Sequence, residues 1–254
     1  ILMLNSICEH AEYLCRTKAT RHNHATMELH GILQVALSFP FFTRSNIWKD
    51  IALKGLVEEL QFQCYPDGSQ NELTSTYHWV STRHFESAME CCRQAGQPMP
   101  EELDKGLEKM WDYLVGVMRP DGSLPLNNDS DRIDIIPEIS SVCRHYNRTD
   151  WENVLKKTKK DPLPLGIAHS WYPWAGHLVT RNGWGRDSRW GFFDMGPWGW
   201  SHQHNDHSHL SVHHYRDLLV DSGRFAYQGD NSIFLHRYGK LSQGHNVLLV
   251  DGKG

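Results

Sequence analysis

His202-Gln203-His204-Asn205-Asp206-His207-Ser208-His209 carries five ionisable side chains in eight residues, a density unusual for a surface loop. An extended backbone would place His202 and His204 on one face, with their side chains about 6.6 Å apart. Neutral imidazole can bind a metal or transfer a proton near pH 7. One histidine could therefore hold a metal while the other stays free for proton transfer. The alternative is a polar turn with solvated histidines.

The chain beyond this stretch predicts strands. Leu210-Ser211-Val212 and Leu218-Leu219-Val220 are β-type runs joined by a tight connection at residues 215–217, and residues 246–250 form a third run. A metal set drawn from neighbouring strands follows, made of His204, Asp221 and His245. Two imidazoles and one carboxylate suit Zn²⁺ and argue against Ca²⁺ or Mg²⁺. Asp206 would support these ligands or form the turn.

Several blocks of sequence after residue 178 carry a family resemblance. They are Arg181-Asn182-Gly183-Trp184, Phe193-Asp194-Met195-Gly196-Pro197, His202-Gln203-His204-Asn205-Asp206, Leu218-Leu219-Val220-Asp221-Ser222-Gly223, and His245-Asn246-Val247 with Val250-Asp251-Gly252. The series resembles the heparinase II/III family of polysaccharide lyases. The resemblance extends to Asn23-His24, Glu28, residues 66–70 and Tyr77-His78. It implies an enzyme with an α/α toroid and a β-sandwich, in the periplasm or secreted.

Residues 1 to about 160 show the spacing of apolar residues that is typical of helices. We expect helices over residues 4–15, 27–37, 47–63, 77–95, 101–118 and 132–146, with Pro137 in the first turn of the last. Pro-Asp-Gly occurs at residues 66–68 and again at 120–122, at the same point of two predicted hairpins. This weak internal repeat predicts helical hairpins stacked side by side, as in an α/α toroid.

The composition changes near Asp161-Pro162-Leu163-Pro164-Leu165, where we expect a linker. Beyond it, apolar residues alternate at residues 177–180 and 190–193, which predicts part of an antiparallel β-sandwich. The expected fold class is therefore α+β with two domains. Residues 1–160 would be the C-terminal part of the toroid, and residues 161–254 the N-terminal part of the sandwich. The chain begins at Ile1 and stops just after a predicted strand, so we expect a fragment of a longer enzyme.

The resemblance implies a role for each candidate catalytic residue. A lyase of this class removes the C5 proton of a uronic acid and expels the sugar at C4. It needs a donor to the substrate carboxylate, a base and an acid. Asn23 and His24 would stabilise the carboxylate, while Tyr77 and His202 would be the acid and the base. Candidate substrate-binding residues are Arg21, His78, Arg83 and Trp200.

Other interpretations of these residues stay open. Asn23 could be a helix N-cap, and Tyr77 could be a partly buried aromatic residue. A zinc-dependent carbohydrate hydrolase would use the metal to activate water. A non-catalytic carbohydrate-binding module would use the histidines only to hold zinc.

Composition limits the partners. The net charge of −4 argues against a general nucleic-acid binder, and an anionic uronate polysaccharide would need local positive charge.

No apolar run approaches the ~18 residues of a membrane span. The six cysteines form no CxxC pair and suit small buried positions. Heparan sulfate, hyaluronan, chondroitin and alginate are not distinguished by the sequence, and neither is the oligomeric state.

Overall fold

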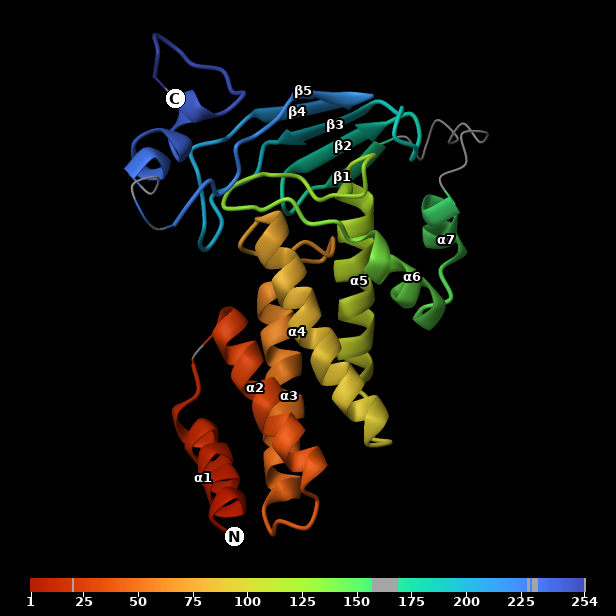
Figure 1. The fold of residues 1–254 in the computed structure, drawn as a ribbon, viewed down its shortest axis with the longest axis vertical. Helices are drawn as coiled ribbons and strands as arrows, with labels where there is room; N and C mark the ends of the chain where they lie inside the picture. The colour runs from red at the N-terminus through yellow and green to blue at the C-terminus, as the bar shows by residue number, and fades with distance from the viewer. Residues whose placement is uncertain (20, 157–168, 228, 230–232, 254) are drawn as a thin grey trace. The chain divides into compact units, whose positions relative to one another are not determined.

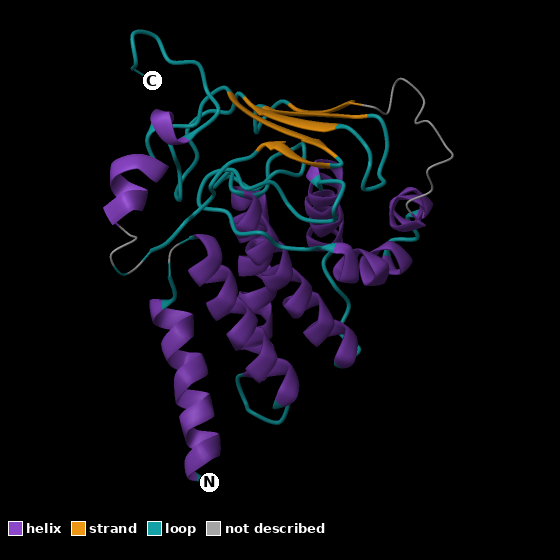
Figure 2. Cartoon of the chain, turned by 45° about the horizontal axis from the view of Figure 1, so that its top comes forward, coloured by secondary structure: helices purple, strands orange, loops and turns teal. Residues whose placement is uncertain are grey.

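The computed structural model describes residues 1–254 except 20, 157–168, 228, 230–232 and 254. The α-helices come first along the chain and the strands follow, and two short helical turns, Leu235–Gly239 and Ser242–Gly244, come after the strands (Figures 1 and 2). The helices are α1 (Leu2–Thr17), α2 (His22–Ser38), α3 (Ser45–Gln63), α4 (Ser75–Gln94), α5 (Glu101–Val117), α6 (Ile136–His145) and α7 (Thr149–Lys156). The strands are β1 (His169–Tyr172), β2 (His177–Arg181), β3 (Trp190–Asp194), β4 (His209–His214) and β5 (Arg216–Leu219). This order confirms the predicted α+β class.

Most predicted elements are found, with two differences. The helix expected from residue 132 begins at Ile136, with Pro137 in its first turn. The strand expected at residues 246–250 is wrong, because only Val250 makes an isolated bridge there and Leu248 is 87% exposed. Its apolar residues have β propensity, but the run forms no ladder within the described chain, and only the Asn246 carbonyl oxygen accepts a hydrogen bond from the Leu210 N–H of β4, at 3.1 Å. The linker predicted at Asp161–Leu165 lies outside the described residues.

The described chain divides into two compact units. The first comprises Ile1–Tyr65 with Trp79–Met110, and the second comprises Pro66–His78 with Trp111–Gly254. The position of one unit relative to the other is not determined. The predicted domain boundary at residue 160 stays a prediction.

The first unit is a helical layer held by close packing of α2 on α3. Leu29 and Leu33 of α2 are buried, as are Trp48 and Leu56 of α3. Gly55 allows the two helices to approach, since a Cβ there would lie 2.6 Å from a Leu29 methyl group. A larger residue at position 55 would separate the helices and leave voids in this core.

The second unit contains one antiparallel sheet with the strand order β1-β2-β3-β4-β5. Alternate residues of β2, β3 and β4 point to a buried face, as a period of two requires. Trp190 and Phe192 form the apolar part of that face. At one end of the strands the buried residues are polar: His177 pairs with Asp194, and Asp194 with His209. The buried face of the sheet thus includes a row of polar side chains at one end of β2, β3 and β4.

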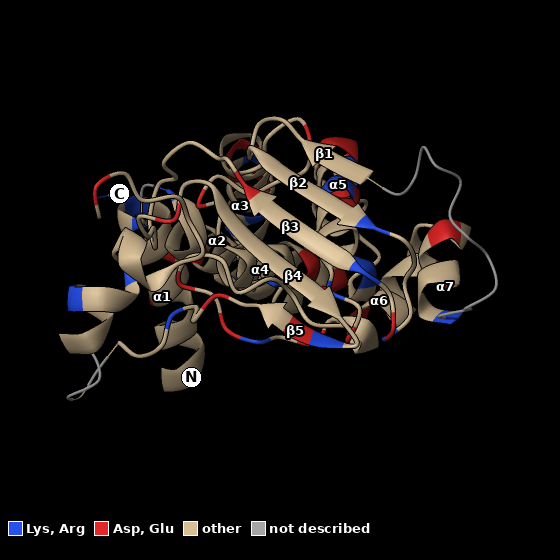
Figure 3. Cartoon of the chain, turned by 90° about the horizontal axis from the view of Figure 1, so that it is seen from above, with Lys and Arg blue, Asp and Glu red and all other residues tan. Residues whose placement is uncertain are grey.

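Charged residues on the strands gather at strand ends (Figure 3). Arg181 ends β2, Asp194 ends β3, and Arg216 and Asp217 begin β5. Arg181 is buried, and its guanidinium donates to the carbonyl oxygens of Gly116 and Met118, at 2.5 and 3.0 Å. A cation at the C-terminal end of α5 is favoured by the helix dipole. Burial lowers the pKa of Arg181 to about 9.

The two Pro-Asp-Gly turns have the same local geometry. In each, the aspartate accepts hydrogen bonds from the backbone N–H and the hydroxyl of the serine two residues later: Asp67 from Ser69 at 3.1 and 2.6 Å, Asp121 from Ser123 at 3.0 and 2.6 Å. The glycines, at residues 68 and 122, have φ angles of 87° and 93°, a region that favours glycine. The repeat seen in the sequence is therefore a repeat of structure at these turns.

Candidate functional site: a histidine cluster around Asp129

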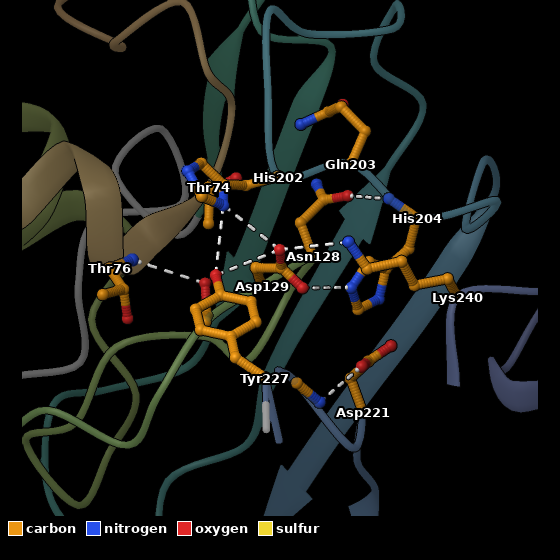
Figure 4. Close-up of polar contacts among 12 residues, drawn as sticks. Thr74, Thr76, Asn128, Asp129, His202, Gln203, His204, Asp221, Tyr227 and Lys240 are labelled. Carbon is orange, nitrogen blue, oxygen red and sulfur yellow. Dashed lines mark hydrogen bonds and ion pairs between the residues drawn. The ribbon is translucent and has the colours of Figure 1, made fainter. Parts of the chain in front are cut away.

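The histidine-rich segment is an irregular loop between β3 and β4, not a strand. His202 has a φ angle of 61°, which an extended backbone does not allow. The expectation that His202 and His204 share a face of an extended chain is therefore wrong. Both imidazoles instead contact one carboxylate, that of Asp129 (Figure 4). Asp129 lies in a loop that was not predicted to belong to the site.

Asp129 is the centre of this cluster, with a side chain that is 1% exposed. Its Oδ1 accepts a hydrogen bond from His204 Nε2 at 2.8 Å. Its Oδ2 lies 3.1 Å from His202 Nδ1, 3.1 Å from the Tyr227 hydroxyl and 3.2 Å from Lys240 Nζ. Burial alone would raise the pKa of Asp129, but the hydrogen bonds from the two histidines and the charge of Lys240 hold that pKa well below its usual range.

Residues 128–129 also form hydrogen bonds with the backbone of the histidine-rich segment. The backbone N–H of Asp129 donates to the His202 carbonyl oxygen at 3.1 Å. The Asn128 side chain accepts the backbone N–H of His204 at 2.7 Å (Figure 4). Residues 128–129 therefore fix both the course of the histidine segment and the direction of its side chains.

His202 is in direct contact with Tyr77. The two rings stack with centroids 3.6 Å apart and planes inclined by 12°. Tyr77 lies in the first turn of α4, and its hydroxyl is 3.1 Å from that of Tyr227. His202 Nε2 lies 3.6 Å from a carboxylate oxygen of the buried Glu72. Two groups able to transfer protons are thus placed in contact within the second unit.

Tyr227 joins these two residues and was missed by the sequence analysis. Its hydroxyl lies 3.1 Å from Tyr77 Oη, His202 Nδ1 and Asp129 Oδ2. Burial, the hydrogen bond with Tyr77 and the nearby Asp129 charge raise the pKa of Tyr227 far above its usual value. Tyr227 stays protonated at neutral pH and acts as a hydrogen-bond donor.

The predicted metal ligands do come together. His204, Asp221 and His245 each offer one ligand atom, and these atoms lie within 4.8 Å of one another. The expectation that they come from three strands is wrong. His204 lies in the loop before β4, Asp221 follows β5, and His245 follows a short 3₁₀ turn, Ser242–Gly244. The set connects loops, because the third predicted strand does not form.

The donor atoms of this set fit a metal. Asp221 Oδ2 lies 2.6 Å from His245 Nδ1, and Asp129 Oδ1 lies 2.8 Å from His204 Nε2. The second nitrogen of the His204 ring, Nδ1, is buried with no hydrogen-bond partner among the described residues. Metal-binding histidines commonly donate one N–H to a carboxylate and bind the metal through the other nitrogen. Unpartnered buried nitrogens are otherwise costly.

Burial and neighbouring charges change the pKa values of two residues at the predicted metal site. Burial lowers the pKa of His245, but the hydrogen bond and charge of Asp221 outweigh it and raise that pKa above its usual value. Burial and the neighbouring charge of Asp194 raise the pKa of Asp206 to about 8. Asp206 also borders a pocket of about 480 Å³, together with His204 and Trp198.

The other predicted residues of the second unit differ in exposure. Trp200 is 63% exposed, and its backbone N–H donates to the Asn71 carbonyl oxygen. His78 is buried, its Nδ1 accepts the backbone N–H of Gln70 at 3.2 Å, and its ring stacks on Tyr113. His78 therefore supports the turn that precedes α4, and a contact between His78 and a substrate stays a prediction.

Four predicted residues lie in the first unit, Arg21, Asn23, His24 and Arg83. Asn23 is the second residue of α2 and is not its N-cap, which is Arg21 without a side-chain capping bond. The Asn23 side-chain oxygen accepts a hydrogen bond from Ser81 Oγ. Arg21 pairs with Glu59 at 3.1 Å, and Arg83 pairs with Glu86. Their contact with a substrate stays a prediction.

A sequence profile described as Heparinase II/III N-terminus matches residues 1–153, more than half of the chain. The chain belongs to the heparinase II/III family. This confirms the resemblance carried by the motifs. Two heparin-sulfate lyases are similar to it: one from Pedobacter heparinus, 25% identical, and one from Bacteroides stercoris, 24% identical. The matches cover 98% and 96% of this chain but only 39% and 38% of those enzymes.

Solved structures agree with the fold of this heparinase II/III family member. The crystal structure of heparan sulfate lyase HepC from Pedobacter heparinus matches with a TM-score of 0.83 and 25% identity, covering 99% of this chain and 40% of that one. A heparinase III matches with a TM-score of 0.85 and 22% identity, covering 96% and 40%. The chain thus spans about two fifths of these relatives. Among the described residues, no helix is long and apolar enough to cross a membrane.

Proposed function

We propose that this chain carries the reacting residues of a lyase that cleaves a uronic-acid-containing polysaccharide by β-elimination. Family membership supports a lyase, since the similar proteins are named heparin-sulfate lyases. The single observation that carries the proposal is the stacking of Tyr77 on His202, with ring centroids 3.6 Å apart. An elimination needs one group to take a proton and one to give it, and here two groups able to do so lie side by side.

The reaction begins with removal of the proton on C5 of the uronate. The electron pair of that C–H bond becomes the C4–C5 double bond as the bond between C4 and the leaving oxygen breaks. Either Tyr77 or His202 takes the C5 proton, and the leaving oxygen receives a proton from the other. The configuration at C5 decides which group is the base. The His202 side chain is 26% exposed, which suits contact with a polymer.

Charge develops on the uronate carboxylate during proton removal. Asn23 and His24 are the proposed donors to that carboxylate, because a hydrogen-bond donor at this place stabilises the enolate that forms. Arg21, Arg83 and Trp200 are proposed to bind the sugar chain. Half of the Arg21 side chain is exposed, although it pairs with Glu59. This part of the proposal rests on the family motifs.

We also propose that the metal is Zn²⁺, held by His204, Asp221 and His245. Two imidazole nitrogens and a carboxylate oxygen are a donor set that Zn²⁺ accepts. When bound, the ion would tie three loops together and so support the loop that carries His202. The elimination itself needs only the side chains named above. A periplasmic or secreted location is proposed from the family alone.

An absorbance assay tests the proposed reaction. The intact protein is incubated with heparan sulfate, hyaluronan, chondroitin and alginate in turn. The C4–C5 double bond conjugated to the carboxylate absorbs in the near ultraviolet, so absorbance should rise with one of these polymers. Chain shortening without new absorbance would show hydrolysis instead. Retention of a polymer with no turnover would favour a binding module.

A further inference from the structure

Asp129 connects the proposed metal site with the proposed reacting histidine through separate oxygen atoms. Oδ1 is 2.8 Å from Nε2 of His204, a proposed metal ligand, and Oδ2 is 3.1 Å from Nδ1 of His202. The carboxylate is almost completely enclosed, so water cannot replace either contact without rearrangement. Figure 4 shows Asp129 between the two rings.

These contacts determine which ring nitrogens carry protons. A carboxylate only accepts hydrogen bonds, and the ion pair with Lys240 Nζ at 3.2 Å favours the ionised form of Asp129. With Asp129 ionised, these contacts favour a proton on Nδ1 of His202 and on Nε2 of His204. Nε2 of His202, which lies 3.6 Å from a Glu72 carboxylate oxygen, is then the nitrogen without a proton. Nδ1 of His204, buried with no hydrogen-bond partner among the described residues, keeps its lone pair for a metal.

We propose that Asp129 couples occupation of the metal site to the position of the His202 imidazole. This inference rests on the proposed function for its catalytic meaning, but the coupling itself does not. A cation held by His204 polarises the imidazole and strengthens its Nε2–H as a donor to Asp129 Oδ1. The carboxylate becomes more rigid, and its Oδ2 then holds His202 in the tautomer and orientation that proton transfer needs. Asp129 is a positioning residue and touches no substrate.

Nuclear magnetic resonance of ¹⁵N-histidine-labelled intact protein tests the coupling without any activity. Zn²⁺ is added to protein freed of metal by a chelator, and the ring nitrogens of His202 are followed. His202 binds no zinc in this proposal, yet its signals should shift and sharpen toward the Nδ1–H tautomer as zinc binds. Zinc binding that leaves the His202 signals unchanged would overturn the proposal, and so would a failure of Zn²⁺ to bind.

The variant Asp129→Asn supplies the second measurement. An amide offers a single acceptor atom, so it cannot receive both imidazole N–H groups. Zinc affinity should fall about 10–100-fold, the usual effect of losing a carboxylate behind a metal-binding histidine. The zinc-induced change at His202 should disappear even at saturating zinc. Persistence of that change in Asp129→Asn would show that the coupling runs through another group.

Asp131→Asn is the matched control. Asp131 lies in the same loop, is 42% exposed, and pairs with Arg224 at 2.5 Å, and no hydrogen bond or ion pair joins it to either histidine among the described residues. This variant should keep the zinc affinity and the His202 response of the unaltered protein. If Asp129→Asn does not fold, the zinc response of the unaltered protein still decides the question.

Kinetics separate this inference from the proposed function. With an active polymer, Asp129→Asn should lower kcat by about 10–100-fold and change KM by less than about twofold, because positioning and not binding is lost. A rise in KM alone would contradict a positioning role. If no polymer is cleaved by the unaltered protein while the His202 response is present, the lyase proposal fails and the coupling stands.

Discussion

The imidazole of His202 lies flat against the phenol ring of Tyr77, with ring planes 12° apart and centroids 3.6 Å apart. The two residues are distant in the sequence and come from different structural elements, a loop before β4 and the first turn of α4. Their contact lies within one compact unit, which also contains Tyr227, Asp129 and Glu72. The proposed acid and base therefore share one polar environment.

Tyr77→Phe should lower turnover by at least ~100-fold, because it keeps the stacked ring but removes the hydroxyl that transfers a proton. The rate of near-ultraviolet absorbance gain measures the effect. Tyr215→Phe is the control, since Tyr215 is 70% exposed in the turn between β4 and β5. Near-normal activity of Tyr77→Phe would remove Tyr77 from the mechanism.

Tyr227→Phe should have a smaller effect. Its hydroxyl donates one hydrogen bond to Asp129 and contacts Tyr77 and His202, without being a proposed acid or base. Loss of one such bond is worth about 0.5–1.5 kcal/mol, or roughly a 2–12-fold fall in kcat. Steady-state kinetics with the active polymer provide the measurement. A loss as large as that of Tyr77→Phe would make Tyr227 a proton-transfer group in its own right.

Asn23→Ala should lower kcat by about 100-fold through lost stabilisation of the enolate, while the melting temperature changes little. Asn5→Ala on the exposed face of α1 is the control. Thermal melting and the absorbance assay are run on both variants. Should Asn23→Ala lose stability and keep kcat, Asn23 would serve only to bind Ser81, whose hydroxyl donates to it.

Asp121 should make stability depend on pH in the acid range. Burial would raise its pKa, but hydrogen bonds from Ser123 and Arg132 and the charge of Arg119 lower the pKa of Asp121 well below its usual value. Because the folded-state pKa is depressed, its stabilisation is present above the unfolded pKa of about 4 and is lost as pH falls further. The melting temperature of Asp121→Asn should lie below that of the unaltered protein at pH 7, and the difference should shrink steadily as pH falls below about 4. Parallel curves over this range would contradict the assignment.

Removal of the proposed zinc should destabilise the second unit. A ligand that binds only the folded state stabilises it, so a chelator should lower the melting temperature and zinc should restore it. His245→Ala should lose the zinc seen by elemental analysis. His214→Ala should keep it, because His214 lies on the face of β4 opposite to the buried His209. Protein prepared without chelator that contains no zinc would refute the choice of metal.

Much of the fold is predictable from the sequence because the signals are local. Helical spacing identifies α1 to α5, and alternation identifies β2, β3 and β4, since each pattern reflects one buried face. The failure at residues 246–250 has a related cause. A β-type run becomes a strand only where a neighbouring strand accepts its hydrogen bonds, and local composition does not reveal that neighbour.

The sequence by itself determined the family, the order of helices and sheet, and the grouping of His204, Asp221 and His245. Only the tertiary structure revealed Asp129 and Tyr227. Asp129 stands in Asn127-Asn128-Asp129-Ser130, which has the composition of an ordinary polar turn, 73 residues before His202. Its role arises because loops that are distant in the sequence lie next to each other in the fold. A buried carboxylate needs hydrogen-bond donors, and these come from the segments that surround it. Local sequence patterns do not show which distant segments will be neighbours.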